Sequence, residues 1–145
     1  MSVEQVARDF ISNMSDSKKV QAMLAPGAMA SGGVLPQAIP MMEAMNVIAG
    51  LTTAFPDLKI DIQQVISNGN QATVKVQLGG TQTGALSLPM PGFQPVPPSG
   101  KKVSVKDAYL VSVVGDKVSH MKVDSPADGG IPAILAQLGV KMPAM

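Results

Sequence analysis

The first third of the chain carries apolar side chains at three- and four-residue spacing, the period of amphipathic helices. The pattern predicts a first helix over residues 3–14, with Ser2 as its cap, and a short second helix over residues 18–24. Residues 25–40, rich in glycine and proline, are expected to form a loop. A third helix is predicted over residues 41–54. Its expected inner side consists of Met42, Met45, Ile48, Ala49 and Thr52 or Thr53.

From residue 58 onward the apolar period changes to two, which is typical of half-buried strands. Residues 58–63 and 73–78 are predicted to form a hairpin. A three-residue loop at positions 68–70 sets Ile62 opposite Val76, so that the apolar faces agree, whereas a two-residue turn would set an apolar residue against a polar one.

Two further strands are predicted at residues 103–114 and 117–124, joined by a turn at Gly115 and Asp116. The proline-rich residues 86–100 are expected to form an edge, a loop or a lid, because proline cannot donate to a strand ladder. A closing helix is predicted over residues 131–138. Helices followed by an antiparallel meander and a short helix indicate an α+β fold, with the sheet curled over the helices in one domain, residues 1–145.

The last predicted strand carries three titratable groups on one face, since His120, Lys122 and Asp124 alternate along it. If the connecting turn has two residues, Tyr109 faces Lys122 and Asp107 faces Asp124. Two opposed carboxylates repel, so burying them together would raise the proton affinity of one, which is the pattern of an acid and a base. A one-residue bulge would break this pairing.

A plainer interpretation of the polar row is that it forms the solvated outer face of the sheet. If the row instead faces inward, the opposite face, with Leu110, Met121 and Val123, is apolar and exposed. Such a patch favours association, so we expect a homodimer or higher homo-oligomer through the outer face of the sheet.

Composition narrows the function classes. The net charge is +1, the basic residues are scattered and the aromatic residues are three phenylalanines and one tyrosine, which disfavours nucleic-acid binding. With no cysteine and a single histidine, neither a thiolate nor a histidine-rich metal site is expected. Charged residues interrupt the first thirteen positions and no long apolar run follows, so we expect neither a signal peptide nor membrane association, and a cytoplasmic location.

Several segments together resemble the SnoaL-like polyketide cyclase family over nearly the whole chain. They are Ala54-Phe55-Pro56-Asp57-Leu58 before a strand, Gly80-Thr81-Gln82-Thr83-Gly84 in the middle, and Asp124 followed by Ala136-Gln137-Leu138-Gly139-Val140. The resemblance implies the cone-shaped α+β barrel shared with nuclear transport factor 2 and ketosteroid isomerase, with an apolar cavity inside the cone.

The resemblance also implies a chemistry. The family's enzymes use the aspartate of the last strand as a general acid/base on an apolar carbonyl compound, without metal or cofactor, and Asp124 matches that position. Enolisation needs a base near the acidic C–H and a donor for the enolate oxygen. The candidate catalytic residues are Asp124, His120 and Asp107, and the candidate substrate-binding donors are Tyr109, Lys122 and Gln82.

Two alternatives stay open on the same fold. Gln82 stands where the family motif often has histidine, and a family loop histidine has no counterpart in residues 28–33, so a non-catalytic ligand-binding or assembly module competes with the enzyme. An epoxide hydrolase would use an Asp-Arg-Asp arrangement, and the single arginine, Arg8, lies on the first predicted helix. The catalytic interpretation expects Asp124 to point into an enclosed cavity.

Overall fold

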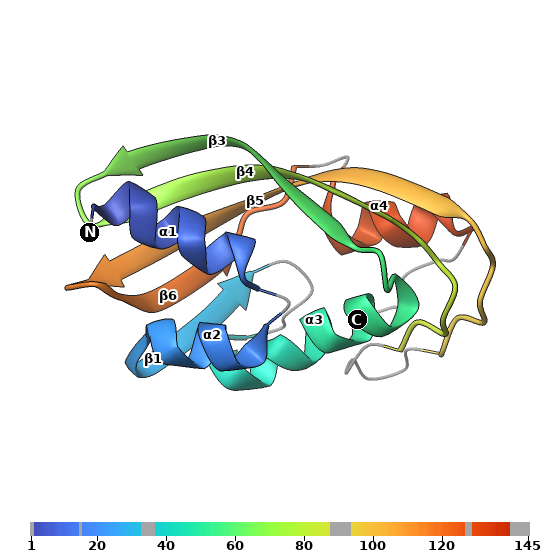
Figure 1. Cartoon of the computed structure of the whole chain (residues 1–145), viewed down its shortest axis with the longest axis horizontal. Helices are drawn as coiled ribbons and strands as arrows, with labels where there is room; N and C mark the ends of the chain where they lie inside the picture. Colours follow the sequence, from blue (N-terminus) through green and yellow to red (C-terminus); the bar gives the residue numbers. More distant parts are fainter. Residues whose placement is uncertain (1, 15, 33–36, 88–93, 127–128, 140–145) are drawn as a thin grey trace.

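A curled six-stranded sheet wraps one side of the molecule, with helices packed inside it and at its end (Figure 1). The computed structural model describes residues 2–14, 16–32, 37–87, 94–126 and 129–139. Its helices are α1 (Val3–Ser12), α2 (Ser17–Met23), α3 (Met41–Ala54) and α4 (Gly130–Gln137). Its strands are β1 (Leu24–Gly32), β2 (Ile39–Pro40), β3 (Lys59–Asn68), β4 (Gln71–Thr81), β5 (Lys102–Val114) and β6 (Lys117–Val123).

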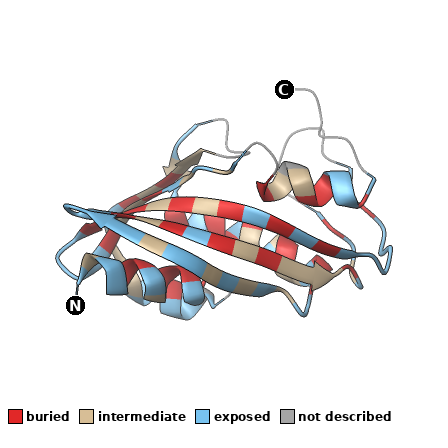
Figure 2. Ribbon diagram, turned by 90° about the horizontal axis from the view of Figure 1, so that it is seen from above, coloured by how far each residue is buried: buried red, intermediate tan, exposed pale blue. Residues whose placement is uncertain are grey.

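The strand order across the sheet is β2-β1-β6-β5-β4-β3, and the β1–β6 pair is the parallel one among antiparallel neighbours. Buried and exposed residues alternate along β4 and β5, as the banding of the strands in Figure 2 shows. One face of these strands therefore lies on the core. The predicted α+β class with a curled, mostly antiparallel sheet is confirmed.

The first two helices begin at side chains that cap them, Ser2 as predicted for α1 and Asp16 for α2. The Ser2 hydroxyl accepts a hydrogen bond from the Gln5 amide at 3.1 Å, and Asp16 accepts one from the Lys19 amide at 3.2 Å. The apolar stripe of α1 is buried against β3 and β4, with Phe10 at its centre fully buried. The helices predicted over residues 3–14 and 18–24 are thus confirmed.

The predicted loop over residues 25–40 is wrong for much of its length, because Leu24–Gly32 forms β1. The strand has little β propensity of its own and exists through its pairing with β6, an example of tertiary context overriding composition. Its small residues Ala28 and Ala30 are buried in the core.

The inner side predicted for α3 is correct at Met45, which is buried, and in part at Ile48, which is half-buried, but not at Met42 or Ala49. Met42 is 39% exposed, whereas Met41, Ala44, Met45, Val47, Leu51 and Ala54 are buried. The helix carries apolar side chains almost all round, so the sequence alone does not decide which of them face the sheet.

The β3–β4 hairpin has the predicted register but not the predicted loop. Ile62 lies opposite Val76, as expected. The turn, however, leaves only positions 69 and 70 between the paired Asn68 and Gln71, and a bulge at Gln63 restores the register further along.

The β5–β6 hairpin has the predicted two-residue turn, with Val114 opposite Lys117. A bulge at Ser119 then shifts every later pair by one residue, so that His120 lies opposite Ser112 and Val123 opposite Tyr109. The predicted pairing of Tyr109 with Lys122 is therefore wrong, because the ladder absorbs one extra residue.

Beyond β4, two residues of the proline-rich region, Leu86 and Val96, form an isolated antiparallel β-bridge, and both are buried. Residues 88–93 of that region lie outside the described residues, so the prediction of an edge, a loop or a lid is not tested there. In the part of the chain that the structure describes, no helix is both long and apolar enough to span a membrane.

Candidate functional site

A cavity of about 60 Å³ lies between α3 and the inner face of the sheet. This volume is several times the roughly 15 Å³ that one water molecule needs. Apolar side chains form most of its wall, including Met14, Met45, Ile48, Leu51, Leu78, Met121 and Val123. The polar side chains in the lining are Asp107, Tyr109 and Ser125. Three converging polar groups in an apolar cavity are the usual composition of a small-molecule site.

Asp107 is the centre of this polar group and is only 6% exposed. Its Oδ2 accepts a hydrogen bond from the Tyr109 hydroxyl at 2.9 Å. Its Oδ1 accepts two, from the Ser125 hydroxyl at 2.6 Å and from the Ala108 amide at 2.9 Å. The three donors are neutral, so the carboxylate is held by hydrogen bonds. The ion pairs described elsewhere, Arg8 with Glu4 and Lys59 with Asp61, lie at the surface.

The surroundings shift the proton affinities of both groups upward. Burial raises the pKa of Asp107 above its ordinary value, while the hydrogen bonds from Ser125, Ala108 and Tyr109 act in the opposite direction. Burial also raises the pKa of Tyr109 well above 10.0, with the nearby charge of Asp107 and the hydrogen bond to it adding to the effect. Asp107 is therefore a strengthened base, and Tyr109 keeps its proton at neutral pH.

The turn before α4 brings Ser125 against Asp107. Gly130 adopts a φ of +70°, and a Cβ there would collide with the Ser125 hydroxyl. A Cβ on Gly129 would collide with the Lys106 carbonyl. Glycine at both positions lets this turn approach β5 closely enough for the short Ser125 contact. Sequence reasoning missed Ser125, although the Gly129-Gly130 pair directly before a helix indicates a close backbone approach.

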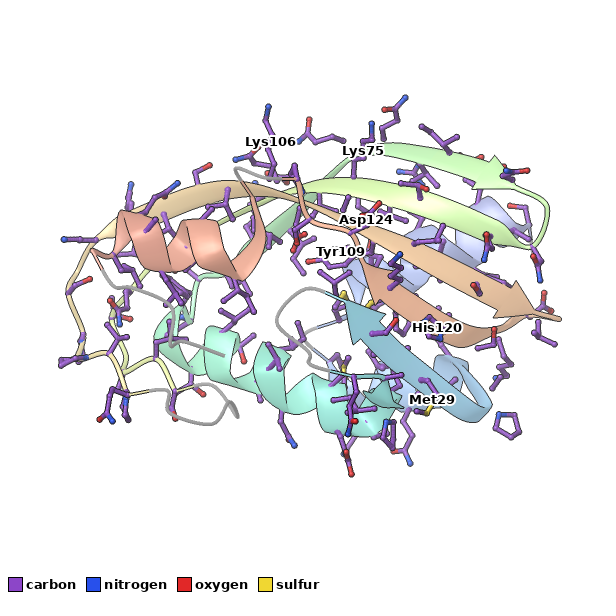
Figure 3. All side chains as sticks on the ribbon, turned by 180° about the vertical axis from the view of Figure 1, so that it is seen from behind. Met29, Lys75, Lys106, Tyr109, His120 and Asp124 are labelled. Atoms are coloured by element: carbon purple, nitrogen blue, oxygen red, sulfur yellow. The ribbon has the colours of Figure 1, made fainter. Side chains whose placement is uncertain are left out.

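The structure separates the row of polar residues that the sequence placed together. Asp107 and Tyr109 point into the core from β5, whereas His120 and Lys122 lie on the opposite face of the sheet. Tyr109, His120 and Asp124 are labelled in Figure 3. Asp124 is exposed and is not part of the cavity lining, and its amide donates to the Ala108 carbonyl at 2.9 Å. The expected placement of Asp124 in the cavity, and of Asp107 directly opposite it, is wrong because of the bulge at Ser119.

Gln82, a predicted substrate-binding donor, is fully buried but does not line the cavity. Its amide nitrogen donates to the carbonyls of Val96 and Pro97 at 3.2 and 3.1 Å, and its amide oxygen accepts from the Ser99 hydroxyl at 2.6 Å. Because its side-chain amide hydrogen-bonds to residues 96, 97 and 99, Gln82 anchors the proline-rich segment to the end of β4. The expected position at the substrate is wrong.

Two other expectations change with the same geometry. Of the predicted apolar outer patch, Leu110 faces outward, but Met121 and Val123 line the cavity. The homo-oligomer expected through the outer face of the sheet therefore no longer rests on an apolar patch of three residues there, and it stays a prediction. Arg8 pairs with Glu4 on the exposed side of α1, so the arginine of an epoxide hydrolase is not at this cavity. Among the described residues, no group of three or more metal-ligating side chains comes together.

Comparisons with known proteins agree with this architecture. The structure of a candidate polyketide cyclase from Streptomyces antibioticus, IdmH, superimposes with a TM-score of 0.75 at 17% identity, covering 97% of this chain and 100% of that one. A candidate SnoaL-like polyketide cyclase from Jannaschia sp. CCS1 gives 0.69 at 22% identity, covering 99% and 97%. An NTF2-like protein from Burkholderia thailandensis E264 gives 0.70 at 15% identity, covering 99% of both chains.

These similarities to solved structures establish the NTF2-like fold. A search of curated proteins found no match. The family model for the SnoaL-like polyketide cyclases matches residues 3–123, which is most of the chain. The protein therefore belongs to the SnoaL-like polyketide cyclase family.

Proposed function

We propose that the cavity binds an apolar small molecule with a carbonyl group, and that Asp107 performs acid/base chemistry on it without a metal or cofactor. The observation that carries the proposal is a buried carboxylate lining an otherwise apolar cavity, with neutral hydrogen-bond donors as its partners. A protein gains little stability from such a group, because desolvating a carboxylate is costly. Membership of the SnoaL-like family supports the carbonyl class of ligand.

The two inward-facing groups of β5 suit the two halves of an enolisation. Asp107 would take the proton from a carbon next to the carbonyl and return it to the product, and its raised pKa brings its basicity closer to that task. Tyr109 stays protonated, and its hydroxyl, which donates to Asp107 Oδ2 in this structure, would turn to the carbonyl oxygen of the ligand and stabilise the negative charge there. The apolar wall excludes water and strengthens both interactions.

This proposal moves the acid/base role from Asp124 to Asp107. Asp124, His120 and Lys122 lie outside the cavity lining, and Gln82 is committed to the proline-rich segment. Asp124 supplies a backbone contact that holds the end of β6 against β5 next to Asp107. Its side chain serves as a control for the role of Asp107.

The test measures enolisation directly and needs no natural substrate. The protein is incubated in D2O with small apolar ketones, cyclohexanone and 2-indanone, and deuterium incorporation next to the carbonyl is followed by NMR. We expect exchange above the buffer rate for the wild type, loss of that excess in Asp107→Asn, and retention in Asp124→Asn. Tyr109→Phe should slow exchange by about 100- to 1000-fold, the range found for a single lost oxyanion donor.

The alternative outcomes are distinct. If the ketones bind, as shown by shifts of the cavity methionine methyl signals, but exchange no faster than in buffer, the non-catalytic binding module is the correct function. Exchange that disappears in Asp124→Asn and persists in Asp107→Asn would overturn the assignment of the base.

A further inference from the structure

A second pair of reactive side chains lies on the outer face of the sheet, away from the cavity. Ser31 on β1 and His120 on β6 place Oγ and Nε2 2.8 Å apart. Both side chains are half-buried, and neither lines the cavity. Figure 3 shows His120 near the junction of β6 and β1, on the side of the sheet that also presents Met29. The enolisation proposed above uses neither residue.

The strand pairing fixes the geometry of this pair. In the parallel ladder, Met29 is level with His120 and Ser31 is level with Lys122, so Ser31 meets the imidazole diagonally from the neighbouring strand. On the other side of His120, Ser112 of β5 is directly opposite it. The Ser112 hydroxyl instead accepts a hydrogen bond from the Gln71 side chain at 3.2 Å. Of the two serines beside the imidazole, Ser31 is therefore the one that is hydrogen-bonded to it.

We propose that Ser31 and His120 form a nucleophile–base pair that accepts an acyl group from an activated ester or thioester. A serine hydroxyl is a weak nucleophile until a base within hydrogen-bond reach takes its proton, and an imidazole at 2.8 Å meets that requirement. The arrangement requires the His120 tautomer that carries its proton on Nδ1, so that Nε2 accepts from the Ser31 hydroxyl.

The step balances without an oxidant or reductant. Ser31 Oγ attacks the acyl carbon while its proton passes to His120 Nε2, and the bond from that carbon to the leaving oxygen or sulfur then breaks. The leaving group takes the proton from His120 and departs as an alcohol or a thiol. The products are O-acylated Ser31 and neutral His120.

The surroundings restrict the acyl donor to activated compounds. The backbone N–H groups of strands lie in the plane of the sheet, whereas the Ser31 and His120 side chains stand on its face, so the amides of β1 and β6 do not point at an acyl group held there. Hydrogen-bond donors free to stabilise a tetrahedral oxyanion are what accelerate attack on amides and ordinary esters. An ester with a good leaving group needs less of that help, and slow deacylation should leave the acyl group on Ser31.

Because His120 is the only histidine, the tautomer can be read without assignment problems. The full-length protein labelled with ¹⁵N gives one set of imidazole signals, which we expect to show the proton on Nδ1. The same sample is then mixed with p-nitrophenyl acetate. We expect a burst of nitrophenolate approaching one equivalent per chain, and an acetyl group on the peptide that contains Ser31.

Matched variants separate chemistry from architecture. Ser31→Ala should abolish the burst, and His120→Gln, which keeps a hydrogen-bonding side chain, should slow acylation by at least 100-fold. Ser112→Ala changes the serine on the other side of His120 and should leave the burst intact. Ser31→Ala should not alter ketone exchange in the cavity.

Three results would overturn the proposal: a proton on Nε2 that donates to Ser31, a burst that survives Ser31→Ala, or acetylation confined to lysines or to the N-terminal amine. Each would make the Ser31–His120 contact a structural link between β1 and β6. A failure here would not affect the role proposed for Asp107, because the two sites lie on opposite faces of the sheet and are measured by different reactions.

Discussion

Gln82→Leu tests whether the buried amide is what fastens the proline-rich segment. The substitution keeps the approximate size of the side chain but removes three hydrogen bonds, to the Val96 and Pro97 carbonyls and from the Ser99 hydroxyl. The Val96 carbonyl keeps its hydrogen bond from the Leu86 amide at 2.9 Å, and Pro97 and Ser99 are exposed and can turn to water, so no buried group is left unpaired. At about 0.5–1.5 kcal/mol for each of the three lost hydrogen bonds, we expect the free energy of unfolding to fall by about 2–4 kcal/mol.

Urea unfolding followed by circular dichroism measures this change. With a urea dependence of roughly 2 kcal/mol per molar, the midpoint should fall by about 1–2 M at an unchanged slope. Gln77→Leu is the matched control, because Gln77 makes one hydrogen bond, to the Ser104 hydroxyl at 2.6 Å on the exposed face, and its loss should cost less than about 0.5 kcal/mol. Equal midpoints for the two variants would show that the amide of Gln82 contributes no special anchoring, and the reasoning would fail.

Three further predictions follow from the site. Burial raises the folded-state pKa of Asp107 above 3.8, so the stability that its protonated form contributes is complete below the unfolded value and is lost as pH rises through the folded value. In unfolding titrations that start below pH 3.8 and run upward, Asp107→Asn should remove that decline, and parallel curves for the two proteins would contradict it. Tyr109→Phe removes a hydrogen bond to Asp107, so the carboxyl pKa should rise further, as ¹³C NMR titration would show, at a cost of about 1 kcal/mol in stability; an unchanged or lower pKa would refute this. Gly129→Ala drives a methyl group into the Lys106 carbonyl and should lower the free energy of unfolding by about 1–3 kcal/mol in calorimetry, whereas a neutral result would show that this turn can relax.

The sequence predicts the helices and most strands because their apolar spacing is set locally. Caps such as Ser2 and Asp16 and the glycine turn at position 115 depend on neighbouring residues alone. Leu24–Gly32 is different, since its small residues become a strand only when β6 lies beside them. A single sequence carries no direct record of that partner.

The sequence predicts the candidate site only in part, and one bulge accounts for the misplaced residues of β6. Asp107 and Tyr109 were correctly chosen as neighbours, but the row of His120, Lys122 and Asp124 was placed on their face of the sheet. The burial pattern of β6 indicates the bulge. Val118 and Met121 are both buried although they are three positions apart, which a regular strand does not allow. Ser125 joins the site through a tertiary contact, for which the Gly129-Gly130 pair is the local sign.

The bulge at Ser119 also changes how β6 tolerates a change in length. Deleting a residue in the middle of a regular strand exchanges the faces of everything after it. In β6, excision of Ser119 would instead leave a regular ladder with Val118 opposite Val113 and His120 opposite Ser112, so inward and outward residues keep their sides. Position 119 is thus a place where the gene can lose one codon without rearranging the cavity, and the expected effect is a straighter strand with less twist. The same reasoning applies to Gln63 in β3, so each of the two hairpins carries one site of permitted length variation.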